Sequence, residues 1–418
     1  MIRFRSFLVL ALAAGLPAQA IQLPYFNSYS FVTLGSVPGV PSAYGGVAFR
    51  AVEPDVLYIM GASNGAGGAM YKIAVVRDAT KHITGFAGSA MQVATAPYND
   101  GGFQFGPNDV AFYTRYPKNE LGQIKMASSA TDKLINLAPH GVAGSVGAMG
   151  FVPAGYPGTG KIKVTSYNTN TFYTGTLVPD ASGTYDLSNV VAGTTIQGAV
   201  EGFIYLPPGS PQFASFQSML VCEFATGGIY AYDLDANADP IRATRRPFMT
   251  GLTGAQGAAI DPLSGDFVFS TFGGSNSVIA VRGFALPCGA SVNYGQGTSG
   301  TGNLTPTLSS TGCFARNQNV SIDVANGRGG AFGSLLMGLT QQSVQVLGIT
   351  VLVVPFAPVN HTLGGGSGAP GAGTWSLPLT IPNDTNLLNT DFFFQSVYFD
   401  PSGPQGVSAT GGLKLQVR

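Results

Sequence analysis

The stretch EGFIYLPPGSPQFASFQSMLVCEFATGGIYAYDLDANADPIRATRRPFMT, residues 201–250, decides the fold. It contains a small apolar strand (EGFIY), a proline-rich turn and a second apolar strand (SMLVCEF). A third strand (GIYAYDL) and a fourth (RATRRPFMT) follow. No amphipathic helix interrupts these strands, so the segment predicts one antiparallel sheet of four strands.

The same pattern recurs along the first two thirds of the chain. Related segments begin at Gly45, Gly101, Gly147 and Gln256, and each joins two apolar strands through a turn that usually contains proline. Four antiparallel strands repeated every 45–55 residues or so are typical of the blades of a β-propeller. We therefore predict an all-β fold with a five-bladed propeller over residues 21–286, or a six-bladed one if a degenerate unit is hidden.

The last repeat lacks a fourth strand of its own. Its third strand, SVIAVRGF, runs directly into a region of different composition. The segment NSYSFVTLG, residues 27–35, is a strand with no other partner. We expect it to complete the last sheet, because an unpaired sheet edge invites aggregation.

The N-terminus has the pattern of a secretory signal peptide. MIRFRSFLVLALAAGLPAQA has two arginines, a short apolar run and a final Ala-Gln-Ala, so we predict removal of residues 1–20. The mature chain is then secreted, or resides at the cell surface or in the periplasm. No later stretch reaches the roughly 18 apolar residues that a membrane helix needs, so we expect no membrane span in the mature chain.

Charge is scarce and balanced. Only 10% of the residues are charged, and 20 basic side chains cancel 20 acidic ones. There is no basic stripe, and we therefore expect no nucleic-acid partner.

The composition changes from Pro287 onward. A junction rich in Gly, Ser and Thr leads into short strands separated by turns, which predicts a β-sandwich over residues 287–418. The end of the chain, from SLPLTIPND through FFFQSVYFDP to GGLKLQVR, resembles a β-domain appended to many secreted bacterial proteins. That resemblance implies an accessory role, such as contact with a glycan or a protein at the cell surface.

The three cysteines divide into two kinds. Cys222 lies in the apolar run SMLVCEF, which predicts a buried thiol. Cys288 and Cys313 flank a Gly-rich segment, and outside the cytoplasm we expect them to form a disulfide.

The repeats resemble those of secreted bacterial β-propeller proteins of the NHL and SMP-30-like kind. The resemblance rests on the G-x-x-F-x-P units, on DLDAN, and on TGLTGAQGAAIDPLSGDFVFSTFGG, and it covers residues 27–285. It is specific for architecture and says little of activity, because propellers carry unrelated functions.

The stretch AYDLDANADP, residues 231–240, raises the question of a metal site. Asp233, Asp235, Asn237 and Asp239 stand two apart, as oxygen ligands do in calcium loops. The positions that would hold the Gly and Glu of an EF-hand are Ala238 and Thr244 instead. The alternative, which we favour, is a hairpin turn whose Asp and Asn side chains bond their own backbone.

Propeller geometry predicts a ligand face where inner strands begin and second strands end. The inner-strand entries carry Tyr44, Asp100, Glu201 and Gln256, and the second-strand exits carry Asn64, Arg115, Tyr116, Tyr167, Asn168, Glu223 and Phe272. We expect Asp100, Glu201 and Glu223 to converge near the axis. Converging carboxylates could bind calcium, as in related lactonase propellers, or serve as acid and base.

Catalytic motifs are scarce, so we predict a secreted, non-catalytic binding or structural protein. Its propeller would present a ligand face, and the β-sandwich would serve for attachment. The alternative is a metal-dependent lactonase-like or glycan-acting hydrolase or lyase, with Glu201 and Glu223 as its acidic pair.

Overall fold

The computed structural model describes residues 19–50, 52–213, 217–274, 276–289, 291–315, 318–382, 384–387 and 390–417. Most of the predicted signal peptide, residues 1–18, lies outside the described residues and stays a prediction. In the described part the regular structure is strand and short 3₁₀ helix, without an α-helix. No helix there is long and apolar enough to cross a membrane. The all-β prediction is confirmed.

Residues before 283 form five antiparallel sheets, and in the first three all strands follow one another in chain order. The first holds β3 (Val47–Arg50), β4 (Glu53–Gly61), β5 (Ala69–Arg77) and β6 (Ile83–Thr95). The second holds β7 (Asn99–Phe105), β8 (Ala111–Arg115), β9 (Glu120–Ile124) and β10 (Lys133–Asn136). The third holds β11 (Val146–Phe151), β12 (Ile162–Ser166), β13 (Thr171–Pro179) and β14 (Tyr185–Thr195).

The remaining two sheets recruit strands from the N-terminus. The fourth holds β15 (Val200–Tyr205), β16 (Ser218–Glu223), β17 (Gly228–Asp233) and β18 (Arg246–Thr250), with β1 (Ala20–Ile21) on its outer edge. The fifth holds β19 (Ala255–Ile260), β20 (Phe267–Thr271) and β21 (Val278–Arg282), completed by β2 (Ser30–Gly35). The predicted closure by residues 27–35 is confirmed, since β2 pairs antiparallel with β21.

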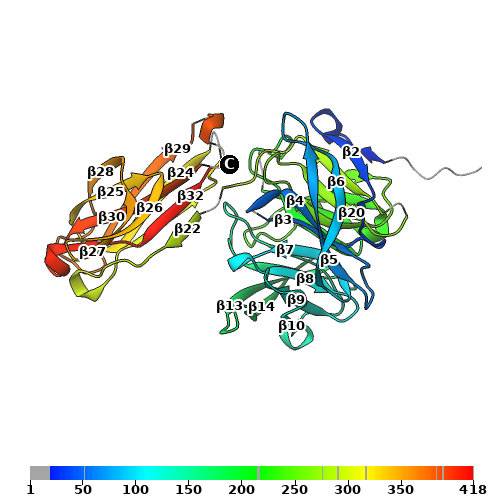
Figure 1. Ribbon diagram of the computed structural model, residues 1–418, viewed down its shortest axis with the longest axis horizontal. Helices are drawn as coiled ribbons and strands as arrows, with labels where there is room; N and C mark the ends of the chain where they lie inside the picture. The colour runs from blue at the N-terminus through cyan, green and yellow to red at the C-terminus, as the bar shows by residue number, and fades with distance from the viewer. Residues whose placement is uncertain are drawn as a thin grey trace, which may run out of the picture.

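The sheets meet through their first strands. β3, β7, β11, β15 and β19 contact one another around a central axis, as the inner strands of a propeller do. Figure 1 shows these sheets together (blue to green), with the later strands grouped beside them (yellow to red). The chain therefore folds as an all-β propeller followed by a further β region.

A repeated irregularity shapes the inner strands. Four of them shift register against their second strand just after their first residue. The shift leaves a backbone N–H without a ladder partner, as a β-bulge does. In the second sheet the N–H of Gly102 donates to Thr114 Oγ1 (3.0 Å), and that hydroxyl donates to Gly147 O of the next sheet (2.8 Å). Ser270 links the fifth sheet to Gly45 of the first in the same way.

The chain after residue 290 has its own sheets and its own cores. One sheet runs in the order β22-β32-β30-β25-β28, with β31 paired to β30; a second runs β23-β24-β29, and β26 and β27 form a hairpin. Their bounds are β22 (Ser291–Tyr294), β23 (Thr307–Gly312), β24 (Asn319–Gly327), β25 (Phe332–Gly338), β26 (Thr340–Val346), β27 (Ile349–Val354), β28 (Ala357–Thr362), β29 (Gly373–Thr380), β30 (Asp391–Phe399), β31 (Val407–Ala409) and β32 (Gly412–Gln416). Leu308, Ile322, Leu335 and Leu413 bring strands of both sheets into one core.

Short 3₁₀ helices of three residues join strands along the described chain. They are η1 (Tyr25–Asn27), η2 (Pro107–Asp109), η3 (Ala138–His140), η4 (Phe224–Thr226), η5 (Arg242–Thr244), η6 (Thr301–Asn303), η7 (Thr385–Leu387) and η8 (Pro404–Gly406).

Removal of β2 should open the propeller. A chain that starts at Ser36 exposes the edge of β21 and loses Tyr25 and Tyr29, which are buried between the fourth and fifth sheets. We expect its melting temperature, followed by circular dichroism, to fall by about 10 °C or more, or the chain to aggregate. A chain that starts at Gln22 loses only β1 and is the matched control. Equal melting temperatures for the two truncated chains would show that β2 does not close the ring.

Candidate ligand-binding site

Three polar side chains meet where the inner strands begin. Asp100 is near the start of β7, Glu201 near the start of β15 and Gln256 near the start of β19. The Gln256 Nε2 donates to Asp100 Oδ1 at 2.6 Å. Glu201 occupies the space beside Gly101, where an added Cβ would stand 2.3 Å from Glu201 Oε2. The sequence-based expectation that Asp100, Glu201 and Gln256 share one end of the axis holds in this structure.

These side chains are buried with acceptors left over. Asp100 is 1% exposed, Glu201 3% and Gln256 1%. Asp100 Oδ2, Glu201 Oε2 and Gln256 Oε1 are each buried without a hydrogen-bond partner in the protein. Buried polar atoms are nearly always partnered, and an unpartnered one costs free energy. A hydrogen-bond donor or a cation placed beside these oxygens would therefore lower the free energy of the folded protein.

The same burial changes how the two acids titrate. Burial raises the pKa of Asp100 to about 8, against the opposing effect of hydrogen bonds from Gly101, Gln256 and Asn64. Burial, and then the charge of Asp100, raise the pKa of Glu201 well above its usual range. With no cation bound, the pair therefore retains a proton at neutral pH.

A small pocket of about 110 Å³ opens over this acidic group. It is lined by Asn64, Tyr116, Tyr167, Glu201, Phe224, Gln256 and Phe272, and is called the axial pocket below. When its amide is turned to donate, the Asn64 nitrogen lies 3.1 Å from Asp100 Oδ1 and 3.1 Å from Asn99 O. Asp100 itself does not line the pocket, so it acts behind Glu201 and Gln256.

Glu223 does not join this group, which corrects our expectation of three converging carboxylates. Its Oε1 accepts from Arg245 Nε (2.8 Å) and its Oε2 from Arg245 Nη2 (2.7 Å). Tyr232 also donates its hydroxyl hydrogen to Oε1. Glu223 is thus neutralised within its own sheet, and the predicted acidic pair of Glu201 and Glu223 does not form.

Other expected face residues are also engaged elsewhere. Arg115 forms an ion pair with Glu120, and its Nε donates to Pro97 O at 2.9 Å. The Tyr44 hydroxyl accepts from the N–H of Val37 within the core. Asn168 is exposed and donates to Gly144 O at 2.9 Å. Of the predicted set, Tyr116, Tyr167, Asn64 and Phe272 do line the axial pocket.

Sequence reasoning missed Phe224. It follows Glu223, which the sequence analysis assigned to the end of the second strand of its sheet. A signal was present, because each pocket ring stands two residues after a small side chain in the second strand. The pairs are Thr114 and Tyr116, Thr165 and Tyr167, Cys222 and Phe224, and Ser270 and Phe272.

The AYDLDANADP stretch forms a turn whose acidic side chains have separate partners. Asp235 Oδ1 accepts from the N–H of Asn237 (2.8 Å) and of Asp239 (2.9 Å), as the favoured turn interpretation predicted. Asp233 forms an ion pair with Arg246, and Asp239 forms one with Lys163. Their oxygens thus pair with two different basic side chains. Within the described residues, no three His, Cys, Asp or Glu side chains group as metal ligands.

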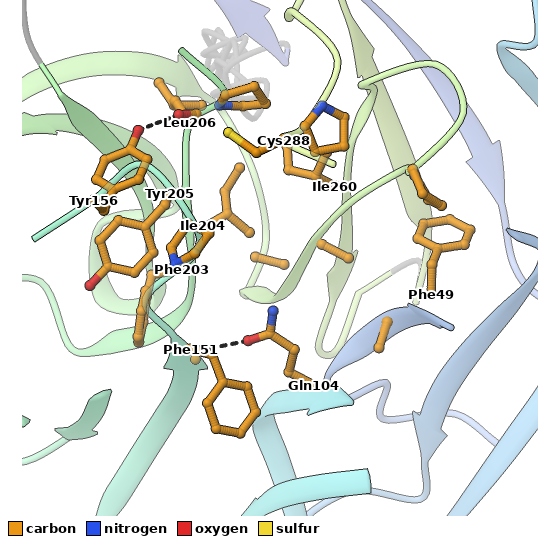
Figure 2. A pocket seen from close by; sticks show the side chains of 18 of the residues that line it. Phe49, Gln104, Phe151, Tyr156, Phe203, Ile204, Tyr205, Leu206, Ile260 and Cys288 are labelled. Atoms are coloured by element: carbon orange, nitrogen blue, oxygen red, sulfur yellow. Dashed lines mark hydrogen bonds between the residues drawn. The ribbon is translucent and has the colours of Figure 1, made fainter. Parts of the chain in front are cut away.

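A second cavity, of about 320 Å³, lies where the inner strands end. Figure 2 shows Phe49, Phe151, Phe203 and Tyr205 around it, and Gln104, whose Oε1 accepts from the N–H of Phe151 (2.8 Å). This cavity is apolar and has no acidic side chain in its lining. The two ends of the axis therefore differ in chemistry.

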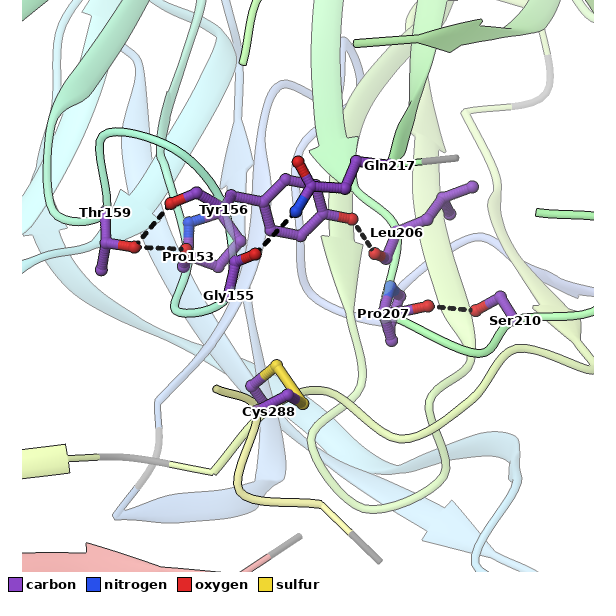
Figure 3. The surroundings of a disulfide bond; sticks show 10 residues. Pro153, Gly155, Tyr156, Thr159, Leu206, Pro207, Ser210, Gln217 and Cys288 are labelled. Carbon is purple, nitrogen blue, oxygen red and sulfur yellow. Dashed lines mark hydrogen bonds between the residues drawn. A yellow bond between two sulfur atoms is a disulfide. The ribbon is translucent and has the colours of Figure 1, made fainter. Parts of the chain in front are cut away.

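The predicted disulfide lies at the rim of the apolar cavity. Cys288 and Cys313 are bonded, with 4.8 Å between their Cα atoms. Figure 3 shows Cys288 beneath the loops that carry Pro153, Gly155 and Pro207. The remaining cysteine, Cys222, is a buried free thiol as expected, and burial raises its pKa.

Comparisons with known proteins give structural neighbours only. No family model matches the chain, and no curated protein matches it by sequence. The solved structures that it resembles include a glutaminyl cyclase of Myxococcus xanthus, with a TM-score of 0.36, 8% identity, and coverage of 61% of this chain and 97% of that one. A gluconolactonase of Xanthomonas campestris has a TM-score of 0.36, 12% identity, and coverage of 65% and 87%. A streptogramin B lyase has a TM-score of 0.30, 10% identity, and coverage of 62% and 98%. These neighbours are bacterial β-propellers, and similarity at this level does not extend to activity.

Loss of Asp239 should cost far more stability than loss of Asp235. Lys163 is fully buried, and its Nζ lies 2.6 Å from Asp239 Oδ1, so Asp239→Ala leaves a buried ammonium without its counter-charge. We expect a loss of about 3 kcal/mol or more in urea unfolding, against about 1 kcal/mol for Asp235→Ala. Adding Lys163→Met to Asp239→Ala should restore part of the loss. Added calcium chloride should change neither cost. Equal costs for the two single variants would contradict the buried ion pair.

Asp100 should make the protein less stable as pH rises. Its pKa is about 8 in the folded chain and lower in the unfolded one, so between roughly pH 4 and pH 8 the folded state holds the extra proton. The free energy of unfolding therefore falls as pH rises through that window. We expect Asp100→Asn to exceed the natural chain in stability by about 1.4 kcal/mol or more at pH 8, and by much less at pH 5. Urea unfolding without amines or divalent cations measures this.

The exposed Asp384→Asn is the control and should leave the pH dependence unchanged. An Asp100→Asn variant with the natural slope between pH 5 and pH 8 would show that Asp100 is ionised at neutral pH.

Proposed function

We propose that this chain is a secreted, non-catalytic binding protein whose propeller takes up a positively charged ligand in the axial pocket. The observation that carries this proposal is that Glu201 Oε2 and Gln256 Oε1, on two side chains that line the pocket, are buried without a hydrogen-bond partner. A bound cation would stabilise both carboxylates in their ionised form and displace the proton that they otherwise retain.

The pocket is built for binding rather than for acid–base chemistry. Glu201 is the only carboxylate in its lining, and Asp100 is separated from any ligand by the residues above it. A general acid or base must lie within hydrogen-bond reach of the proton that it transfers. The pocket therefore presents one carboxylate, Glu201, to a ligand, and burial, together with the charge of Asp100 behind it, raises the pKa of Glu201.

The region after residue 287 is proposed to attach the protein. We propose that it is an accessory β-sandwich that contacts a glycan or a protein at the cell surface. Support comes from its separate cores and from its resemblance to a β-domain that many secreted proteins carry.

A metal-dependent lactonase-like or glycan-acting hydrolase or lyase is the second candidate. The raised pKa of Glu201 favours the glycan-acting form without a metal, because a carboxyl that stays protonated near neutral pH can donate a proton. In the metal-dependent, lactonase-like form calcium would be the cofactor, with Glu201, Gln256 and Asn64 as the oxygen donors nearest to the pocket. The loss of Glu223 from the site weakens this candidate.

Thermal stability in the presence of cations tests the proposal. At pH 8 and constant ionic strength, we expect 10 mM calcium chloride or 10 mM n-propylammonium chloride to raise the melting temperature by about 2 °C or more over sodium chloride. The increase should disappear in Glu201→Gln and persist in Glu53→Gln, which removes the same charge at the far end of β4. The increase should be smaller at pH 6, where Asp100 holds its proton.

If neither salt stabilises the natural chain more than Glu201→Gln, the axial pocket is not a cation site. Calcium-dependent hydrolysis of a lactone or a glycan that Glu201→Gln abolishes would establish the second candidate instead.

A further inference from the structure

The rim of the axial pocket is a collar of aromatic rings. Tyr116, Tyr167, Phe224 and Phe272 come from four successive sheets and are named the aromatic collar. Neighbouring ring centroids are 5.6, 6.3 and 6.1 Å apart, with interplanar angles of 67°, 65° and 65°. These are edge-to-face contacts, so the rings support one another in a continuous arc.

The collar lies above the acidic group. Its four rings are half-buried, whereas Glu201 and Gln256 are buried, so the rings form the mouth of the pocket and the polar side chains its deep end. Tyr167 is close enough to respond to the acids, since burial and then the charge of Glu201 raise its pKa. A ligand in the pocket therefore contacts ring atoms and a carboxylate together.

We propose that the axial pocket binds the ammonium head of a protonated aliphatic amine, with the aromatic collar around its carbon atoms and Glu201 and Gln256 beneath its nitrogen. This inference rests on the proposed cation-binding function and names the class of ligand. Aromatic rings attract a cation through the negative charge of their faces, and more strongly where water is excluded. A buried carboxylate then supplies the counter-charge.

The oxygen atoms that line the pocket suit an amine better than a metal ion. Calcium takes six to eight oxygen ligands, whereas the pocket lining supplies one carboxylate and two side-chain amides. The unpartnered Glu201 Oε2 and Gln256 Oε1 are hydrogen-bond acceptors, which the N–H groups of an ammonium ion would satisfy. A quaternary ammonium ion has no N–H and would leave them unpartnered.

The size of the pocket limits what can enter. A volume of about 110 Å³ is room for several water molecules, since a cavity of roughly 10–15 Å³ on the same measure already holds one. The pocket can thus hold a small headgroup and not a sugar chain or a folded segment. The rest of a larger amine would extend past the collar into solvent.

Calorimetric titration with n-propylammonium chloride at pH 8 tests the inference. We expect binding by the natural chain, none of comparable strength for neutral n-propanol, and weaker binding of tetramethylammonium. Glu201→Gln should abolish binding. Tyr167→Leu and Phe224→Leu should each weaken it about 10-fold, the loss of one ring face. Tyr167→Phe keeps the ring and should retain most of the affinity, and Glu53→Gln is the unaffected control.

The outcomes separate this inference from the function beneath it. Calcium binding that needs Glu201, with no binding of propylammonium, would overturn the amine proposal and leave cation binding standing. Amine binding that both Leu variants retain, with their folding verified by circular dichroism, would remove the collar from recognition. Tetramethylammonium binding as tight as propylammonium would exclude the N–H contacts. No binding of any of these cations would overturn both proposals.

Discussion

The close approach of the inner strands at the axis is the constraint on which the rest of the propeller depends. A Cβ added at Gly257 would stand 2.6 Å from Gly46 Cα, and one at Gly202 would stand 2.5 Å from Gln256 O. At Gly147 the nearest atom would be Val200 O, at 2.2 Å. The sheets therefore pack backbone against backbone, which only residues without a side chain permit. Such packing strips water from the strand starts, and the bulges with their Thr and Ser hydroxyls satisfy the N–H groups left there.

The same constraint builds the axial pocket. Because Gly101 has no side chain, Glu201 can lie across the axis beside it, within the reach of Asp100. Two acids then share a site with little water, which would be costly for the fold unless one is protonated or a cation is present. The structure shows no arginine or lysine that neutralises either acid in the described chain, although Glu223, Asp233 and Asp239 each have such a partner. This contrast distinguishes the axial acids from the structural ones.

Much of this was predictable from sequence, because repeats fix equivalent positions. The repeat placed the strands and the closure by β2, and it placed Asp100, Glu201 and Gln256 on one face. Turn chemistry predicted the turn at Asp235, and the expected compartment predicted the disulfide. The prediction failed at two residues. Glu223 was misplaced because its partner, Arg245, precedes the fourth strand of the same sheet, and sequence order does not reveal how far that side chain reaches. Phe224 was missed because its charged neighbour Glu223 was assigned to the end of the second strand, although the spacing from Cys222 matches that of the other three rings from their small residues.

The arrangement of the two ends of the axis follows from which way the inner strands run. All five begin at the acidic end and finish at the apolar cavity. Residues at equivalent positions of the repeat therefore surround the axis at the same level. At the end of the second strands, equivalent positions hold four aromatic residues. Directly before an inner-strand glycine they hold Tyr44, Asp100, Val146, Glu201 and Gln256. Acids at two of these positions, Asp100 and Glu201, therefore lie buried at the deep end of the pocket, beneath the aromatic collar. The repeat thus supplies the aromatic wall of the pocket. Polar residues that differ from one repeat to the next supply the charge and the hydrogen-bond acceptors that distinguish one ligand from another, and they are Asp100, Glu201 and Gln256.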